Sequence, residues 1–175
     1  MVIDPTAARR LPDVRPIDQR LREPAVIVHR SALELIMRES VASLDGTETG
    51  GLVLGSTEFE RIEIRHAGGP GPRARRTAST FDRDLNHAQL IAADAWERDR
   101  SQWIGEWHTH PHGPLAPSGR DITSYQAHLR DPDLGFQQFV CLIVGAPRDG
   151  TTPLTAWIVR PSSIQPATLV LDEEE

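Results

Sequence analysis

Residues 106–121 have the sequence Glu-Trp-His-Thr-His-Pro-His-Gly-Pro-Leu-Ala-Pro-Ser-Gly-Arg-Asp, and this stretch decides the fold that we expect. His108 and His110 are two residues apart at the end of an apolar run, so on a strand both rings point to the same side. Asp121 belongs to the next predicted element and supplies a carboxylate. Two imidazoles, one carboxylate and an open fourth position are the donor set of a catalytic zinc site.

Ser118 and Asp121 also fit a purely structural role. Ser-x-x-Asp before a helical pattern is typical of a capping box, with serine as N-cap and the acid at the third helical position. The local sequence by itself favours this structural explanation. The two roles are compatible, because a capped helix start beside the strand end would present Asp121 to a metal. Ser118 would then face the same cavity and could donate a hydrogen bond to an oxyanion.

A metal hydrolase also needs a general base, and the residues leave two glutamates open. Glu106 lies on the histidine strand and, by alternation, on the same face. Glu48 is distant in the sequence but precedes Gly50 and Gly51, which allow another strand to pass close by. Local sequence does not choose between the two.

The remaining pattern predicts a single mixed α/β domain with a central sheet flanked by helices. Residues 139–144 are continuously apolar and predict a central strand that is buried on both faces. Ser31 and Glu34 predict a capping box, and residues 55–58 predict a hairpin turn. We expect further strands at 25–28, 52–54, 59–65, 102–108 and 154–159, a short piece at 168–171, and helices at 31–44, 85–96 and 118–130.

The predicted domain occupies residues 25–171. Residues 1–24 lack periodicity and predict an arm, and residues 172–175 form an acidic tail. Residues 66–80 are the most irregular internal stretch and contain Arg73, Arg75 and Arg76.

Composition excludes several classes of protein. The net charge is −6, of which residues 172–175 supply four negative charges, so the remainder carries −2 (−6 + 4). This balance disfavours nucleic acid as a partner. No apolar run approaches the ~20 residues of a membrane span, and the N-terminus does not resemble a secretory signal. Cys141 is the single cysteine, which excludes an internal disulfide and a Cys-rich zinc site. We expect a cytoplasmic protein.

The spacing His108-x-His110, seven residues, Ser118, two residues, Asp121 resembles the JAMM signature of the JAB/MPN zinc isopeptidases. Residues 48–55, Glu-Thr-Gly-Gly-Leu-Val-Leu-Gly, resemble the glutamate segment of that family. The resemblance implies a cytidine-deaminase-like fold and a zinc peptidase with one Zn²⁺ bound by His108, His110 and Asp121. It implies that Glu48 is the general base and acid and that Ser118 stabilises the tetrahedral intermediate. All five positions are filled, which argues against the metal-free scaffold members.

Within the family, the Gly-Pro-rich segment 69–72 and the string at 105–111 resemble the bacterial JAB deconjugases of anti-phage and mobile-element operons. The resemblance implies that the partners are enzymes similar to those that activate and conjugate ubiquitin. It implies cleavage after the C-terminal glycine of a ubiquitin-like protein, or after a C-terminus similarly joined to lysine. All 19 basic residues are arginine, and the sequence contains no lysine. Two explanations stay open: a coding bias toward arginine, or avoidance of conjugation to the protein's own lysines.

Substrate contacts are less defined. An extended substrate tail is expected beside an exposed strand edge. With Glu48 as the base, Glu106 becomes either a group behind the metal ligands or a substrate contact. Arg73, Arg75 and Arg76 either grip the tail or belong to a solvated loop.

Three alternative functions stay open. The first is hydrolysis of sulfur-carrier or short peptide adducts, and the second is a catalytically inactive binding module of a conjugation system. The third is a non-haem iron oxygenase, which also uses two histidines and one carboxylate. His112 is interpreted as a loop residue, and Cys141 and His128 lack the spacing of a second, structural zinc site.

Overall fold

The structure is a computed structural model that describes residues 24–43, 45–58, 61–148 and 151–172 of the 175-residue chain. Its elements are β1 (Ala25–His29), α1 (Arg30–Ala42), β2 (Gly50–Glu58), β3 (Arg61–Ala67), β4 (Arg75–Thr77), β5 (Thr80–Asp82), α2 (Leu85–Asp99), β6 (Gln102–His110), α3 (Gly119–Arg130), β7 (Phe139–Gly145), β8 (Leu154–Arg160) and β9 (Ser163–Asp172). The predicted arm up to residue 23 and the predicted tail from residue 173 lie outside the described residues.

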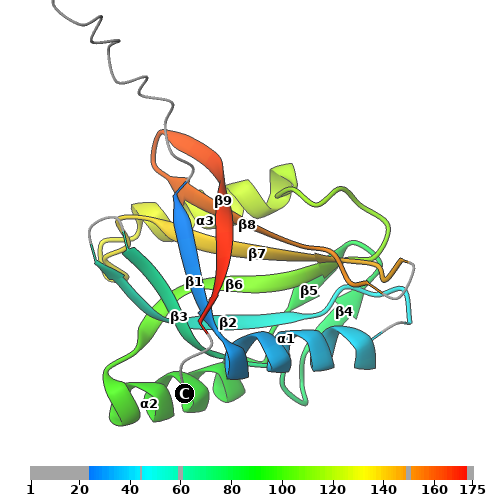
Figure 1. Ribbon diagram of the computed structural model, residues 1–175, viewed down its shortest axis with the longest axis horizontal. Helices are drawn as coiled ribbons and strands as arrows, with labels where there is room; N and C mark the ends of the chain where they lie inside the picture. Colours follow the sequence, from blue (N-terminus) through cyan, green and yellow to red (C-terminus); the bar gives the residue numbers. More distant parts are fainter. Residues whose placement is uncertain (1–23, 44, 59–60, 149–150, 173–175) are drawn as a thin grey trace, which may run out of the picture.

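Seven strands form one mixed sheet in the order β1-β3-β2-β6-β7-β8-β9, and parallel pairing between β1 and β9 closes it into a barrel. β6 and β7 are parallel, whereas β2 pairs antiparallel with both β3 and β6. β4 and β5 form a separate small hairpin (Figure 1). The predicted fold class, a single mixed α/β domain, is confirmed.

The central strand β7 is buried along its whole length, as its apolar sequence predicts. Val140, Leu142 and Val144 belong to the apolar cluster that α1 covers, together with Val28 and Ile36. The alternate residues of β7 belong to a second cluster on the other face, with Tyr125 of α3; they are Phe139, Cys141 and Ile143. The two-sided burial follows from the period of two along a strand.

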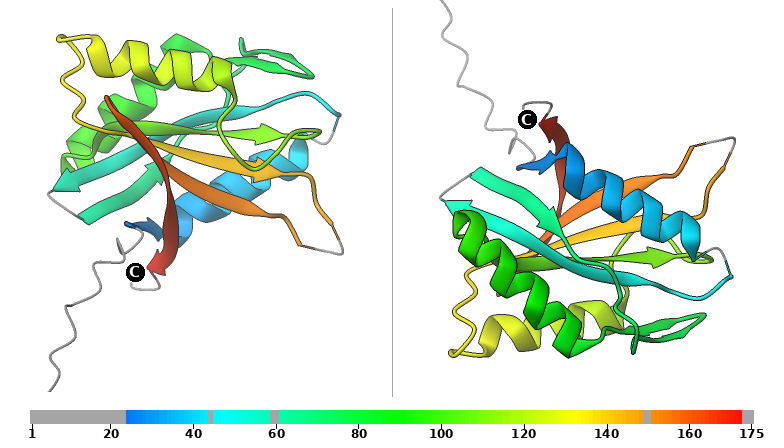
Figure 2. Two further views of the ribbon diagram at one scale, coloured as in Figure 1. Left: turned by 90° about the horizontal axis from the view of Figure 1, so that it is seen from above. Right: turned by 90° about the horizontal axis from the view of Figure 1, so that it is seen from below.

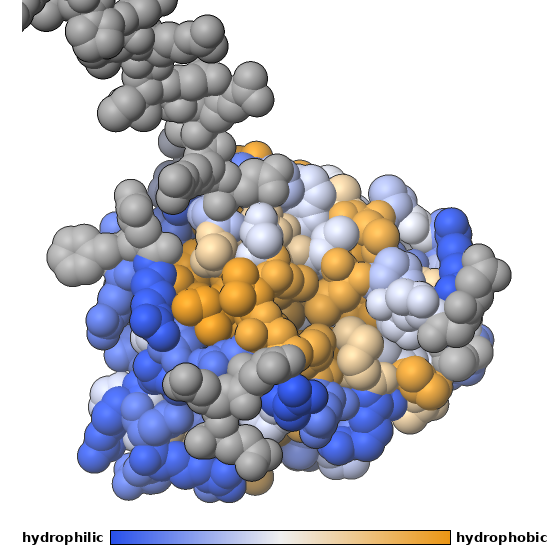
Figure 3. Space-filling model, in the orientation of Figure 1, coloured by the Kyte–Doolittle hydropathy of each residue, from blue (hydrophilic) through white to orange (hydrophobic). Residues whose placement is uncertain are grey.

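Helices cover both faces of the sheet. α1 lies on one face, and α2 and α3 lie on the other (Figure 2). The N-cap of α2 is Asp84, whose side chain accepts hydrogen bonds from the backbone N–H groups of Asn86 and His87. Apolar side chains gather on the face seen in Figure 3, on which the partly buried apolar residues of α1, β8 and β9 pack against the core.

The start of α1 differs from the prediction. The helix begins at Arg30, directly after β1, and its N-cap is His29 without a side-chain capping bond. Ser31 is therefore inside the first turn and caps nothing. The ring of His29 instead lies 2.8 Å from the Glu63 carboxylate, so the strand-to-helix corner is fixed by a tertiary contact.

Two strands are longer than predicted. Residues 55–58 stay in β2, because each of them pairs with β3, and the connection falls at residues 59–60, outside the described part. The piece expected at 168–171 is part of the ten-residue strand β9, which pairs with β8 and β1. Polar residues and Pro166 interrupt the first half of β9, so its sequence shows only the short apolar run at 169–171.

Gly50 and Gly51 provide the close approach expected from the sequence. A Cβ atom on Gly50 would lie 2.4 Å from the Trp107 carbonyl oxygen, and one on Gly51 would lie 1.8 Å from the Gly68 carbonyl oxygen. The start of β2 can therefore lie beside the end of β6, with Gly50 opposite His108. Within the part of the chain that is described, no helix is long and apolar enough to cross a membrane.

Candidate metal centre

His108 and His110 occupy the C-terminal end of β6 and are 3% and 6% exposed. As alternation predicts, their rings lie together, and the two Nε2 atoms are 2.9 Å apart. β7 runs parallel beside this strand end, with Ile143 opposite His108 and Gly145 opposite His110. The buried sheet therefore fixes the backbone that carries both rings.

Asp121 is delivered by the N-terminal cap of α3. Ser118 Oγ accepts a hydrogen bond from the Asp121 backbone N–H at 3.2 Å, and Asp121 Oδ2 accepts one from the Ser118 backbone N–H at 2.7 Å. The predicted capping box is thus present. The same Oδ2 atom lies 3.6 Å from His108 Nε2 and 3.5 Å from His110 Nε2, so the cap also presents the carboxylate to the histidines.

The three side chains fit a zinc ion. Zinc bonds of about 2.0–2.2 Å at tetrahedral angles separate the ligand atoms by roughly 3.3–3.6 Å. The two distances from Asp121 Oδ2, 3.6 and 3.5 Å, lie in this range, whereas the distance between the two Nε2 atoms, 2.9 Å, is shorter. Burial alone would raise the pKa of Asp121, but hydrogen bonds with His108, His110 and Ser118 outweigh it and hold that pKa well below its usual range. The carboxylate is thus ionised, as a metal ligand must be.

The second ring nitrogens of the two histidines have different surroundings. His110 Nδ1 lies 2.7 Å from the Pro114 carbonyl oxygen, which only accepts hydrogen bonds, so this nitrogen carries the proton. His110 Nε2 is then the nitrogen with a lone pair for a metal. His108 Nδ1 is buried and has no hydrogen-bond partner among the described residues. The nearest carboxylate oxygen is Glu106 Oε1, at 3.8 Å.

Glu48 reaches the centre from the segment before β2. The Thr49 backbone N–H donates to Thr109 Oγ1 at 2.9 Å, and the Thr109 backbone N–H donates to the Thr49 carbonyl at 2.8 Å. This pair ties the residue after Glu48 to the residue between the two histidines. Burial raises the pKa of Glu48, and the neighbouring histidines oppose the increase. A raised pKa suits a carboxylate that must both accept and return a proton.

Glu48, His110 and Ser118 line one cleft of about 300 Å³, with Ala78 and Ser79 at the tip of the β4–β5 hairpin. A second cleft of about 600 Å³ lies on the other side of the loop 110–114 and reaches Arg148 and Pro153. His110 lines both clefts, so the site is open to solvent on both sides of this residue. His112, interpreted from the sequence as a loop residue, lines both clefts.

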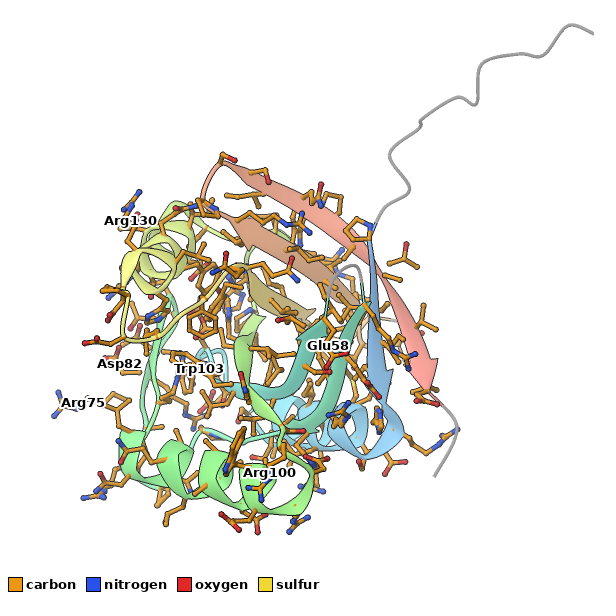
Figure 4. The ribbon with its side chains drawn as sticks, turned by 90° about the vertical axis from the view of Figure 1, so that its left-hand side faces the viewer. Glu58, Arg75, Asp82, Arg100, Trp103 and Arg130 are labelled. Atoms are coloured by element: carbon orange, nitrogen blue, oxygen red, sulfur yellow. The ribbon has the colours of Figure 1, made fainter. Side chains whose placement is uncertain are left out.

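The three arginines proposed as substrate contacts are not brought to the cleft that contains Glu48. Arg73 hydrogen-bonds to the Asp84 carboxylate, which caps α2. Arg76 lies 3.4 Å from Asp45, and Arg75 is exposed and points away from the domain (Figure 4). None of the three lines that cleft among the residues that the structure describes. The backbone of the hairpin, rather than these side chains, borders it.

Glu106 faces away from the cleft and forms an ion pair with Arg83, a residue that the sequence did not single out. Arg83 precedes the cap of α2, and nothing in its local sequence indicates a partner on β6. Thr49 and Thr109 were also missed, because a hydrogen bond between segments 60 residues apart leaves no local pattern.

A second group of possible metal ligands consists of His29, Glu63 and Asp172, which lie within 4.8 Å of one another. Glu63 also accepts a hydrogen bond from Arg65 at 3.0 Å, so the group is a network of ion pairs at the barrel seam. Cys141 is fully buried with its Sγ 3.1 Å from the Tyr125 hydroxyl, and His128 stacks on Phe139. Both therefore have packing roles.

The family described as "Prokaryotic homologs of the JAB domain" matches residues 18–159. The chain belongs to this family. This JAB domain is 35% identical over 98 residues to a CD-NTase/cGAS isopeptidase of Pseudomonas aeruginosa (strain BWHPSA011 / Pa011), an alignment that covers 55% of this chain and 62% of that protein. It is 30% identical over 101 residues to a CD-NTase/cGAS isopeptidase of Escherichia coli (strain TW11681), covering 57% and 62%. The chain thus spans less than two thirds of the length of both relatives.

The solution structure of protein DSY2949 from Desulfitobacterium hafniense is similar to this JAB domain with a TM-score of 0.60. The two chains are 17% identical, and the match covers 85% of this chain and 94% of that one. At this identity the likeness concerns the fold alone.

Proposed function

We propose that this JAB-family chain is a zinc-dependent isopeptidase that releases a protein C-terminus from the lysine to which it is conjugated. The observation that carries the proposal is the convergence of His108 Nε2, His110 Nε2 and Asp121 Oδ2 within 3.6 Å of one another. The cleft beside them contains Glu48, a glutamate whose pKa is raised by burial. This donor set with an adjacent base is that of a metal hydrolase.

The relatives named CD-NTase/cGAS isopeptidases support a substrate of the same class. We propose that the conjugated C-terminus is that of a CD-NTase or a similarly conjugated, ubiquitin-like protein. Activating-like and conjugating-like enzymes would form the bond that this chain cleaves. The clefts on either side of loop 110–114 would hold the C-terminal tail and the lysine side, with the tail extended along the β4–β5 hairpin.

When bound, zinc would lower the pKa of a water in its open position and polarise the scissile carbonyl. Glu48 accepts the proton of the attacking water and returns it to the leaving lysine amine. Ser118 Oγ uses a lone pair to accept the Asp121 N–H, which leaves its own O–H as a donor to the oxyanion. Asp121 and the Pro114 carbonyl orient the histidines throughout.

The test uses the purified chain with measured zinc content and a substrate in which a CD-NTase C-terminal peptide is joined to a lysine side chain. Glu48→Gln should bind zinc normally and lose at least about 100-fold in hydrolysis, because only the proton acceptor is removed. Glu34→Gln, an exposed glutamate on α1, is the matched control and should keep full activity. Chelation of the zinc should abolish hydrolysis in both the wild type and this control.

Three results would contradict the proposal. An active Glu48→Gln variant would show that another residue is the base. Faster cleavage of linear fusions or sulfur-carrier adducts than of the lysine-linked peptide would favour the alternative hydrolase. Absence of stoichiometric zinc together with tight binding of the uncleaved conjugate would favour an inactive binding module.

A further inference from the structure

Glu106 and Arg83 form a partly buried ion pair behind the metal centre. The side chains of Arg83 and Glu106 are 15% and 14% exposed, and Arg83 Nη2 donates to Glu106 Oε2. The guanidinium of Arg83 also lies over the Trp103 ring, 5.6 Å from its centroid. Arg83, from the segment between β5 and α2, therefore holds the Glu106 carboxylate in one orientation, on β6 two residues before His108.

The other oxygen of that carboxylate faces a buried nitrogen that has no partner. Glu106 Oε1 lies 3.8 Å from His108 Nδ1, and His108 is 3% exposed. The opposite nitrogen, His108 Nε2, points to His110 and Asp121. A neutral imidazole that binds a metal through Nε2 carries its proton on Nδ1. This buried N–H requires an acceptor, and among the described residues Glu106 is the carboxylate within 4 Å of it.

His110 provides an internal comparison. Its Nδ1 already donates to the Pro114 carbonyl at 2.7 Å, so a backbone acceptor fixes its tautomer. His108 has no equivalent backbone bond among the described residues. A movement of less than about 1 Å would bring Glu106 Oε1 within hydrogen-bond distance of Nδ1. Each histidine would then have one outer acceptor.

We infer that Glu106 is a positioning residue that fixes the tautomer and orientation of His108, and that Arg83 holds the Glu106 carboxylate for this purpose. The inference rests on the proposed metal site. The sequence left Glu106 open as a group behind the metal ligands or as a substrate contact, and the inference selects the first role, because the carboxylate faces the back of His108 and does not line the cleft. Outer carboxylates of this kind typically change metal affinity by about 10- to 100-fold.

The first experiment measures zinc affinity by competition with a chromophoric chelator and needs no substrate. Glu106→Ala should weaken zinc binding about 10- to 100-fold. Glu106→Gln should weaken it less, because its amide oxygen can still accept the His108 N–H. Arg83→Met keeps the apolar stem but releases the carboxylate, and should fall between the wild type and Glu106→Ala.

The control is Glu63→Gln on β3. Glu63 has a similarly buried side chain, pairs with Arg65 and contacts a histidine, but it faces no ligand of the proposed centre. Its zinc affinity should equal that of the wild type. Thermal unfolding of each metal-free variant establishes that it folds. An equal loss of affinity in Glu63→Gln and Glu106→Ala would reduce the role of Glu106 to general stability and overturn the inference.

The second experiment follows the His108 Nδ1–H proton of the zinc-bound protein by NMR. In the wild type the Glu106 carboxylate should protect this proton from exchange with water, whereas in Glu106→Ala it should exchange faster. An unchanged exchange rate with unchanged zinc affinity would overturn the inference. If that variant instead shows only a raised KM, Glu106 is a substrate contact. The wild type could fail to hydrolyse any conjugate while the zinc affinities of the variants still fall in the expected order. That result would contradict only the proposed function.

Discussion

At the scale of single residues, Ser118 has two functions that substitutions can separate. Its Oγ caps α3, and its hydroxyl lies in the cleft with Glu48. Ser118→Ala should lower the free energy of unfolding by about 1 kcal/mol, whereas Ser118→Gly should lower it by only a few tenths of a kcal/mol, because glycine is tolerated at an N-cap. Both variants should lose about 100-fold in kcat if the hydroxyl stabilises the oxyanion.

Urea unfolding and steady-state kinetics of the two variants provide the measurements. The informative comparison is Ser118→Gly, which is nearly as stable as the wild type but lacks the donor. Full activity in this variant would show that Ser118 only caps the helix.

Asp99 gives a pH dependence that is independent of the metal centre. Burial alone would raise its pKa, but hydrogen bonds with Ser101 and His66 outweigh it and lower the pKa from 3.8 to about 2. Because the folded-state pKa lies below the unfolded-state value, the stabilisation is present above about pH 4 and is lost as the pH falls toward 2. Asp99→Asn should therefore be less stable than the wild type near neutral pH, and this difference should shrink between about pH 4 and pH 2. Urea unfolding across this range tests the expectation, and a pH-independent difference would contradict it.

At the scale of elements, the start of β2 depends on glycine. A Cβ on Gly51 would lie 1.8 Å from the Gly68 carbonyl oxygen, a backbone atom that cannot rotate away. Gly51→Ala should therefore destabilise the fold by about 1–3 kcal/mol and displace the segment that carries Glu48. Gly119→Ala is the control, because a Cβ there meets no atom within 4 Å. Its stability should be unchanged or slightly higher.

Elements with strong local patterns were predicted correctly. The apolar run of β7 and the Ser118–Asp121 capping box are local properties, and the structure contains both. The cap predicted at Ser31 is wrong, because the chain passes from β1 into α1 without a loop in which serine could act. A local signal fails when a tertiary contact, here His29 with Glu63, fixes the corner instead.

At the scale of the whole molecule, β9 closes the barrel by pairing with both β8 and β1. Leu169 packs against the main apolar cluster, whereas the next residue, Val170, is 43% exposed. Leu169→Asp should lower the free energy of unfolding by about 2 kcal/mol or more, since it places a carboxylate against the core. Val170→Asp should have a small effect. Denaturant unfolding of this neighbouring pair tests whether β9 is integral to the domain, and equal effects would contradict its inward and outward alternation.

The sequence by itself determined the donor types of the candidate centre and much of the framework that carries them. The period of two on β6 and the cap of α3 are set by neighbouring residues, so the positions of His108, His110 and Asp121 could be predicted locally. The stretch 66–80 was predicted to be irregular, and this is correct only in part, because Arg75 and Arg76 belong to strand β4. The direction of the arginine side chains could not be predicted.

Only the tertiary structure decided what surrounds the ligands. The local sequence left Glu48 and Glu106 open as the base, and only the resemblance to the family favoured Glu48. The fold brings Glu48 to the cleft and Glu106 behind His108, paired with Arg83. The closure of the barrel by β9 was likewise not predictable, because the sequence of this strand does not indicate that it pairs with β1. The physical reason is the same in each case. Pairing between distant segments depends on the packing of the whole sheet, and no local pattern of residues encodes it.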